Sequence, residues 1–120
     1  MVRAAIQLAA MPFAVLSYQG HPNIPRSAAE AIEELTSNPR VEALILFGSR
    51  AFGDHEDRSD IDLAVFGPGI SRNEWALLRD RVASARTLYW ISLVHLDRNP
   101  ATLRHRILTT GIVIYAKKTS

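Results

Sequence analysis

Apolar and polar residues follow a helical period over the segment that begins at residue 27. The apolar positions recur at i, i+3, i+4 and i+7, which predicts a helix with one buried face. Ser27 and Glu30 have the spacing of a capping box and predict where this helix begins, and Asn38-Pro39 predicts where it ends. The apolar positions are Ala28, Ala31, Ile32 and Leu35.

The rest of the chain alternates between strand-like apolar runs and segments with helical signals. One helix is predicted to start at the capping box of residues 71–74, and another to run from Asn99-Pro100 to Gly111, with the asparagine as its N-cap. The order is helix, strand, strand, helix, strand, helix, strand, which predicts an α/β (α+β) fold with one mixed sheet of about four strands and helices packed on it. The strand-like runs are residues 41–47, 62–66, 89–96 and 112–115.

The segment before residue 26 is predicted to be an extension. Residues 20–25 are rich in turn formers, so we place a boundary there and expect an extension over residues 1–25 and a domain over residues 26–120. The extension opens with an apolar run, but Gln7 and Pro12 interrupt it, and it falls short of the ~20 apolar residues that a membrane span needs. We therefore expect a segment that packs on the domain of a cytoplasmic protein, with no membrane association.

Composition and charge exclude some kinds of site and some classes of protein. The 120 residues include no cysteine, which excludes disulfides and thiolate metal ligands. The formal charge of +2 is too small to indicate a nucleic-acid-binding protein by itself. Residues 1–70 carry nine acidic and five basic side chains, whereas residues 71–120 carry three acidic and nine basic ones. This asymmetry could place a cation site beside a surface that attracts phosphates, or could simply form two differently charged solvated faces.

Asp60 and Asp62 stand two positions apart at the start of a predicted strand. Side chains at this spacing project from the same face, so the two carboxylates are expected to lie together. Adjacent carboxylates stay ionised only if a cation or several hydrogen-bond donors lie between them. Mg²⁺ suits such a pair because it takes hard oxygen ligands and commonly combines one or two carboxylates with substrate phosphates. Taken alone, however, an Asp-x-Asp pair is more often a solvated turn.

Gly48 and Ser49 follow the predicted strand of residues 41–47. Glycine lets the backbone approach another group closely and adopt a positive φ. Exposed N–H groups and a hydroxyl just beyond such a turn can hold phosphate oxygens, especially if a helical turn begins there. The segment is not a P-loop, because the Gly-Lys-Ser/Thr ending is missing. The turn and the aspartate pair together indicate a site for a phosphorylated ligand and a divalent cation.

These motifs resemble those of a known family. Gly48-Ser49, ten intervening residues and Asp60-x-Asp62 are similar to the signature of the DNA polymerase β-like nucleotidyltransferase superfamily. The longer pattern F-G-S-R-A-F-G-D…S-D-I-D-L-A-V more closely resembles the minimal nucleotidyltransferases, small proteins often paired with a HEPN-domain toxin. The resemblance spans roughly residues 27–116 and implies the nucleotidyltransferase fold.

The resemblance also implies roles for the matching residues. Gly48 and Ser49 would bind the triphosphate of ATP, and Asp60 and Asp62 would be the catalytic residues that bind Mg²⁺. The implied reaction is the attack of a hydroxyl on the α-phosphorus, which transfers AMP and releases pyrophosphate. We expect the hydroxyl to belong to a HEPN-type toxin, because so small a domain has little room for acceptor-binding elements of its own. In that case the protein would act as the antitoxin.

Arg50 follows this turn directly and leaves two interpretations open. It could add a positive charge beside the phosphates and so bind the nucleotide, or it could form a salt bridge to Asp54 or Glu56 in the loop.

The sequence departs from the family pattern at a third carboxylate, which is expected on the strand beside Asp-x-Asp. The matching segment, residues 90–97, has Ser92 at that position, and serine is a poor metal ligand and, unactivated, no base. Asp97 lies about 17 Å further along the strand, at about 3.3 Å per residue, and on the opposite face. The alternative hypothesis is therefore a weakened or inactive antitoxin that acts by binding its partner. Binding of nucleic acid by the basic half is less favoured, and self-association stays open.

Overall fold

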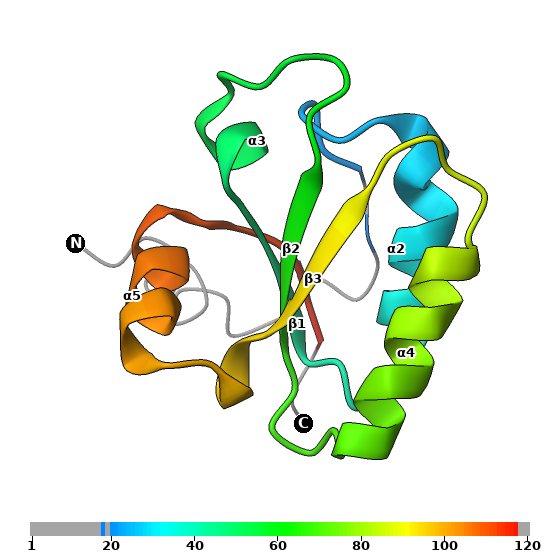
Figure 1. Cartoon of the computed structure of the whole chain (residues 1–120), viewed down its shortest axis with the longest axis vertical. Coiled ribbons are helices and arrows are strands. Elements are labelled where there is room, and N and C mark those ends of the chain that lie inside the picture. Colours follow the sequence, from blue (N-terminus) through cyan, green and yellow to red (C-terminus); the bar gives the residue numbers. More distant parts are fainter. Residues whose placement is uncertain (1–17, 19, 118–120) are drawn as a thin grey trace.

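The computed structural model describes residue 18 and residues 20–117, and its strands and longer helices follow the predicted order (Figure 1). All four predicted strands are present, and the first and third are shorter than predicted. The elements are the 3₁₀ helix η1 (Arg26–Ala28), α2 (Ala29–Thr36), β1 (Ala43–Phe47), α3 (Ser49–Phe52), β2 (Ile61–Phe66), α4 (Arg72–Ser84), β3 (Ile91–His95), the 3₁₀ helix η2 (Leu96–Arg98), α5 (Ala101–Thr110) and β4 (Ile112–Ala116).

The strands form one mixed sheet in the order β3-β2-β1-β4. The β1–β2 and β1–β4 pairs are antiparallel, and the β2–β3 pair is parallel. In Figure 1, α2 and α4 lie on one side of the sheet and α5 lies on the other. The predicted fold class, a mixed sheet of about four strands with helices packed on it, is confirmed.

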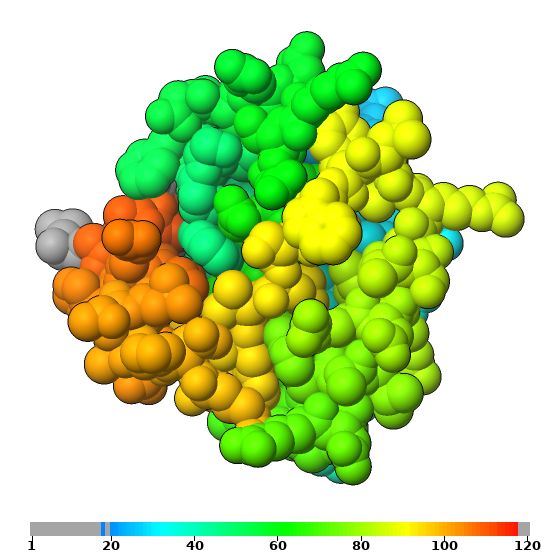
Figure 2. All heavy atoms as spheres, in the orientation of Figure 1, coloured from blue at the N-terminus to red at the C-terminus, as the bar shows by residue number. Residues whose placement is uncertain are grey.

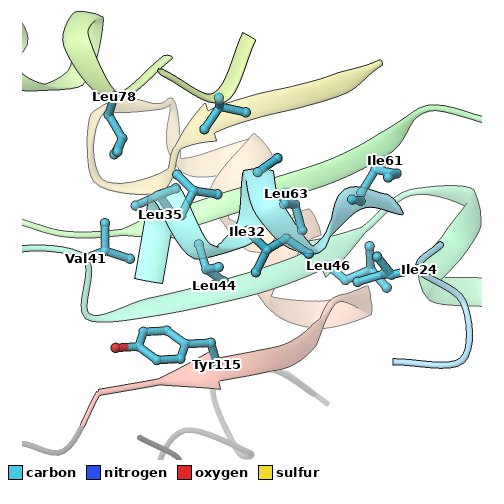
Figure 3. Close-up of a cluster of buried hydrophobic side chains, with 14 of the residues drawn as sticks. Ile24, Ile32, Leu35, Val41, Leu44, Leu46, Ile61, Leu63, Leu78 and Tyr115 are labelled. Carbon is cyan, nitrogen blue, oxygen red and sulfur yellow. The ribbon is translucent and has the colours of Figure 1, made fainter. Parts of the chain in front are cut away.

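Alternating side chains give the sheet a separate core on each face. On β1, Leu44 and Leu46 point into the cluster beneath α2 and α4, whereas Ile45 points into the cluster beneath α5. Figure 3 shows the larger cluster, in which Ile61 and Leu63 of β2 lie beside α2. Side chains at even positions of β2 therefore lie on the face of α5.

The structure confirms one of the three predicted helix caps. The capping box of α4 is confirmed on the serine side, since Ser71 Oγ accepts from the Glu74 N–H at 3.1 Å. The predicted cap at Ser27 is wrong, because Ser27 lies inside η1, where a helical backbone rules out the extended conformation of an N-cap. The predicted cap at Asn99 is also wrong: its Nδ2 donates to the carbonyl of His95 at 2.6 Å, and Pro100 precedes α5 instead.

The turn-rich segment of residues 20–25 packs against the domain. Ile24 is buried in the larger core, and its N–H donates to the carbonyl of His21 at 3.0 Å. The predicted boundary after residue 25 thus separates Ile24 from a core to which it contributes. The apolar run assigned to the extension, residues 1–17, lies outside the described residues. Within residues 20–117, no helix combines the length and the apolar character needed to cross a bilayer.

Candidate functional site

The end of β1 is a backbone turn that glycine alone adopts readily. Gly48 has φ 72° and ψ −157°, a region that is essentially restricted to glycine. A β-carbon at this position would overlap Asp62 Oδ2 and lie 3.1 Å from Asp62 Cγ. The glycine therefore makes the turn and also allows the Asp62 carboxylate to approach the backbone of that turn.

The turn leads directly into the short helix α3, whose first polar groups lack hydrogen-bond partners among the described residues. The N–H groups of Ser49 and Arg50 lie in its first turn and have no acceptor within the helix. The next donor, the Ala51 N–H, bonds to the Gly48 carbonyl at 3.1 Å. The Ser49 side chain is half-buried, and its hydroxyl makes no hydrogen bond with another described residue. These groups are the kind that bind phosphate oxygens.

Asp62 lies in the sheet between the two neighbouring strands. It is paired with Phe47 of β1 on one side and with Ser92 of β3 on the other. Because Ile61 is in the core beneath α2 and α4, Asp62 points to the opposite face of β2. Figure 2 shows that green and teal atoms of the β1–β2 region stay visible between the orange α5 and the yellow β3. The β1–β2 region that carries Asp62 is therefore not fully covered by the described helices.

Electrostatics link the two aspartates. Burial raises the pKa of Asp62 above its ordinary value of 3.8, and repulsion from the Asp60 carboxylate raises this pKa further. The hydroxyl of Ser92 donates a hydrogen bond to Asp62 and lowers its pKa, in opposition to the two larger effects. The structure thus brings together Gly48, Ser49, Asp60 and Asp62, with Ser92 beside the aspartate pair.

The structure places Ser92 at the position where the family pattern would place a third carboxylate, next to Asp62 on β3. Asp97 lies in η2 and accepts a hydrogen bond from the Gly67 N–H at 2.9 Å, just beyond the other end of β2. In the described part of the chain, no three His, Cys, Asp or Glu side chains gather where they could hold a metal ion. Among the residues that the structure describes, the aspartate pair therefore has no third carboxylate with which to hold a metal ion.

Arg50 is used differently from either sequence-based interpretation. Its side chain is buried, with 2% exposure, and its guanidinium donates to the backbone carbonyls of Ser59, Asn23 and Asp57. Among the described residues it forms no salt bridge with Asp54 or Glu56. An arginine in a polar loop gives no sequence signal of burial, so this role could not be predicted from the chain alone.

The fold and the site define a class of protein. A mixed sheet in which a glycine-serine turn faces an aspartate pair is the arrangement expected of a nucleotidyltransferase. The family model described as "Polymerase beta, Nucleotidyltransferase" matches residues 29–120, and the chain belongs to this family. Comparison with curated proteins gave no significant match.

Solved structures with the same fold include toxin–antitoxin proteins. One is the crystal structure of a toxin–antitoxin with AMP-PNP, which is 27% identical to this chain with a TM-score of 0.61, over 74% of this chain and 73% of that one. Another is a toxin–antitoxin MntA–HpeT mutant in which two aspartates, two positions apart, are replaced by glutamate. It is 24% identical with a TM-score of 0.58, over 74% of this chain and 72% of that one. At this identity, the similarity shows that the two proteins share a fold and shows nothing about function.

Proposed function

We propose that the protein transfers AMP from ATP to a hydroxyl group of a partner protein. The observation that carries this proposal is the contact between the Gly48 turn and the Asp62 carboxylate, because it puts a phosphate-binding element and a cation-binding element at one place. Structural similarity to a toxin–antitoxin protein bound to AMP-PNP supports a nucleoside triphosphate as the ligand.

The residues present fit a divalent cation such as Mg²⁺. Asp60 and Asp62 offer hard oxygen ligands, and the raised pKa of Asp62 shows that its negative charge is not fully compensated by the protein. A cation would relieve both the burial of this charge and its repulsion from Asp60. With two carboxylates only, the remaining ligands would be water and phosphate oxygens, as is common for Mg²⁺.

The side chains would contribute mainly positioning and charge. When bound, the cation would neutralise phosphate charge and make the acceptor hydroxyl more acidic. The N–H groups of Ser49 and Arg50 and the hydroxyl of Ser49 would hold the phosphates. Ser92 would help to keep Asp62 ionised by donating its hydrogen bond. In the reaction, the acceptor oxygen bonds to the α-phosphorus while the bond to the leaving pyrophosphate breaks, and the proton of the acceptor hydroxyl passes to water.

We infer that the acceptor is a toxin and that the protein acts as its antitoxin. Two observations support this: similar structures are toxin–antitoxin complexes, and the motif resembles proteins paired with HEPN-domain toxins. The described residues form a single sheet with its covering helices and leave little room for separate acceptor-binding elements, which favours an acceptor on a partner protein.

The test is the transfer of label from α-labelled ATP to the co-purified product of the adjacent gene in the presence of Mg²⁺. The double substitution Asp60→Asn and Asp62→Asn should abolish labelling. Asp80→Asn is the matched control, because it removes an exposed carboxylate of α4 outside the site. Labelling that persists in the double variant would rule out the proposed roles of the two aspartates.

A second candidate function is favoured by Ser92. Without a third carboxylate, the protein could neutralise its partner by binding alone. In that case wild-type protein would transfer no label, and both complex formation and suppression of toxicity would survive replacement of Asp60 and Asp62. If the double variant lost suppression while still forming the complex, this candidate would be excluded.

A further inference from the structure

Arg50 is a buried cation that belongs to the turn after β1 and contacts the backbone of the loop before the aspartate pair. Its Nη2 donates to the Ser59 carbonyl at 2.9 Å and to the Asp57 carbonyl at 3.2 Å, and its Nε also reaches the Ser59 carbonyl, at 3.2 Å. Ser59 directly precedes Asp60, and Arg50 directly follows Ser49. One rigid guanidinium thus joins the turn that ends β1 to the loop that leads into the aspartate pair.

Asn23 completes this arrangement from outside the loop. Arg50 Nη1 donates to the Asn23 carbonyl at 2.8 Å, and Asn23 Nδ2 donates in return to the Arg50 carbonyl at 2.7 Å. The Asn23 N–H donates to Nδ1 of His21 at 3.1 Å, and Ile24 anchors the same segment in the core. Asn23 lies before residues 29–120, the part of the chain that the family model matches. It nevertheless binds Arg50, which directly follows the Gly48-Ser49 turn.

The chemistry of Arg50 explains why its guanidinium holds the loop in place and does not bind the ligand. A planar guanidinium presents five N–H donors in a fixed fork, and here the fork is bound by three carbonyl groups. The Tyr89 ring centroid lies 5.3 Å from Arg50 Cζ, within the range of a cation–π contact. With 2% exposure, little of the side chain is left to reach a phosphate.

We propose that Arg50, braced by Asn23, is a positioning residue that fixes the separation between Ser49 and the Asp60–Asp62 pair. This inference rests on the proposed function, since it assumes that the turn binds phosphates and the aspartates bind the cation. It makes residues 20–25 a structural part of the site. Loss of the Arg50 and Asn23 contacts should leave the turn at Ser49 and the Asp60–Asp62 pair each able to bind. It should weaken the binding of a ligand that contacts both of them.

The first experiment measures how tightly the loop of residues 53–60 is held. Arg58 is an exposed trypsin site in this loop, so cleavage after it, followed by mass spectrometry under native conditions, reports loop opening. Asn23→Ala should speed this cleavage about fivefold, the effect of about one net hydrogen bond, and Arg50→Lys should speed it by more than about tenfold.

The matched control for this experiment is Arg40→Lys. Arg40 also donates to a backbone carbonyl, that of Gly69 at 3.0 Å, but its side chain is 57% exposed and it belongs to another loop. Cleavage after Arg58 should be unchanged in this variant. Equal cleavage in wild type and in a folded Arg50→Lys variant would overturn the proposal, as would equal acceleration by Arg40→Lys.

The second experiment tests positioning itself, through the coupling between cation and nucleotide. Mn²⁺ affinity is measured by electron paramagnetic resonance with and without a non-hydrolysable ATP analogue. In the Arg50→Lys variant, Mn²⁺ alone should bind within about twofold of wild type, but the gain in affinity caused by the nucleotide should fall by about tenfold. An undiminished gain would contradict a positioning role.

The two experiments separate this inference from the proposed function. If wild type shows no nucleotide-dependent gain in Mn²⁺ affinity, the proposed function fails, and with it the positioning role. The protease result then still decides whether Arg50 and Asn23 hold the loop. If Arg50→Lys does not fold, Asn23→Ala serves in both experiments, with effects in the same direction and about fivefold in size.

Discussion

Gly48→Ala is the substitution that perturbs the site with the fewest added atoms. It adds one methyl group where the backbone has φ 72° and ψ −157°, a conformation that costs on the order of 1–3 kcal/mol for a residue with a side chain. The new methyl would also overlap Asp62 Oδ2, so the carboxylate must move away from the turn. We expect a loss of stability of this size together with loss of ATP–Mg²⁺ binding.

The assay combines thermal unfolding with calorimetry. At roughly 4 °C per kcal/mol, the melting temperature should fall by about 4–12 °C, and the affinity for ATP–Mg²⁺ should fall by more than about tenfold. Gly69→Ala is the matched control, because a β-carbon there meets no atom within 4 Å, and both measurements should stay near wild type. Wild-type affinity in a folded Gly48→Ala protein would refute the claim that turn and carboxylate form one site.

A double-mutant cycle divides this effect into its two causes. In the background of Asp62→Ala, the carboxylate that the new methyl group meets is gone, so Gly48→Ala should cost only the backbone strain. A smaller loss of stability than in wild type measures the steric overlap. Equal losses in the two backgrounds would show that the carboxylate does not lie against the turn.

Three further predictions concern the aspartate pair. The raised pKa of Asp62 means that the native state binds a proton more readily than the unfolded chain, so the stability of cation-free protein should fall as pH rises from 3.8 through the native pKa. Asp62→Asn should remove this decline. The melting temperatures of wild type and variant, measured in EDTA as a function of pH, test this, and the same pH dependence in both proteins would contradict the prediction. Ser92→Ala removes the hydrogen bond that lowers this pKa, so tight Mn²⁺ binding should require a higher pH. Ser92→Asp should lower the melting temperature in EDTA through repulsion and raise the stabilisation by Mg²⁺, whereas no change in either would count against a cation between β2 and β3.

The sequence predicts the parts of this protein in which local pattern and tertiary packing agree. The apolar run of residues 41–47 predicts a strand, and the structure forms β1 there because helices cover both faces of the sheet, with Leu44 and Ile45 in separate cores. The position of Ser92 beside Asp62 is implied by the family resemblance, and the structure pairs the two residues; a shift by one residue would move the apolar side chains of β3 off the core.

The parts that could not be predicted depend on long-range contacts. Ser27 has a capping-box sequence, yet Pro25 and the packing of Ile24 start the helical backbone earlier. Arg50 resembles a surface charge in the sequence, because nothing local indicates that the Asn23 and Ser59 carbonyls will surround it. Its contacts span 27 residues in one direction and 9 in the other, beyond the range of any local pattern.

Isothermal titration of ATP in the presence of Mg²⁺ measures whether the Gly48-Ser49 turn and the Asp60–Asp62 pair form one ligand site. We predict saturable binding at one site in wild type, and loss of that binding both in the Asp60→Asn, Asp62→Asn double variant and when EDTA removes the cation. Wild type that gives no binding heat, or a double variant that binds as wild type does, would contradict this prediction.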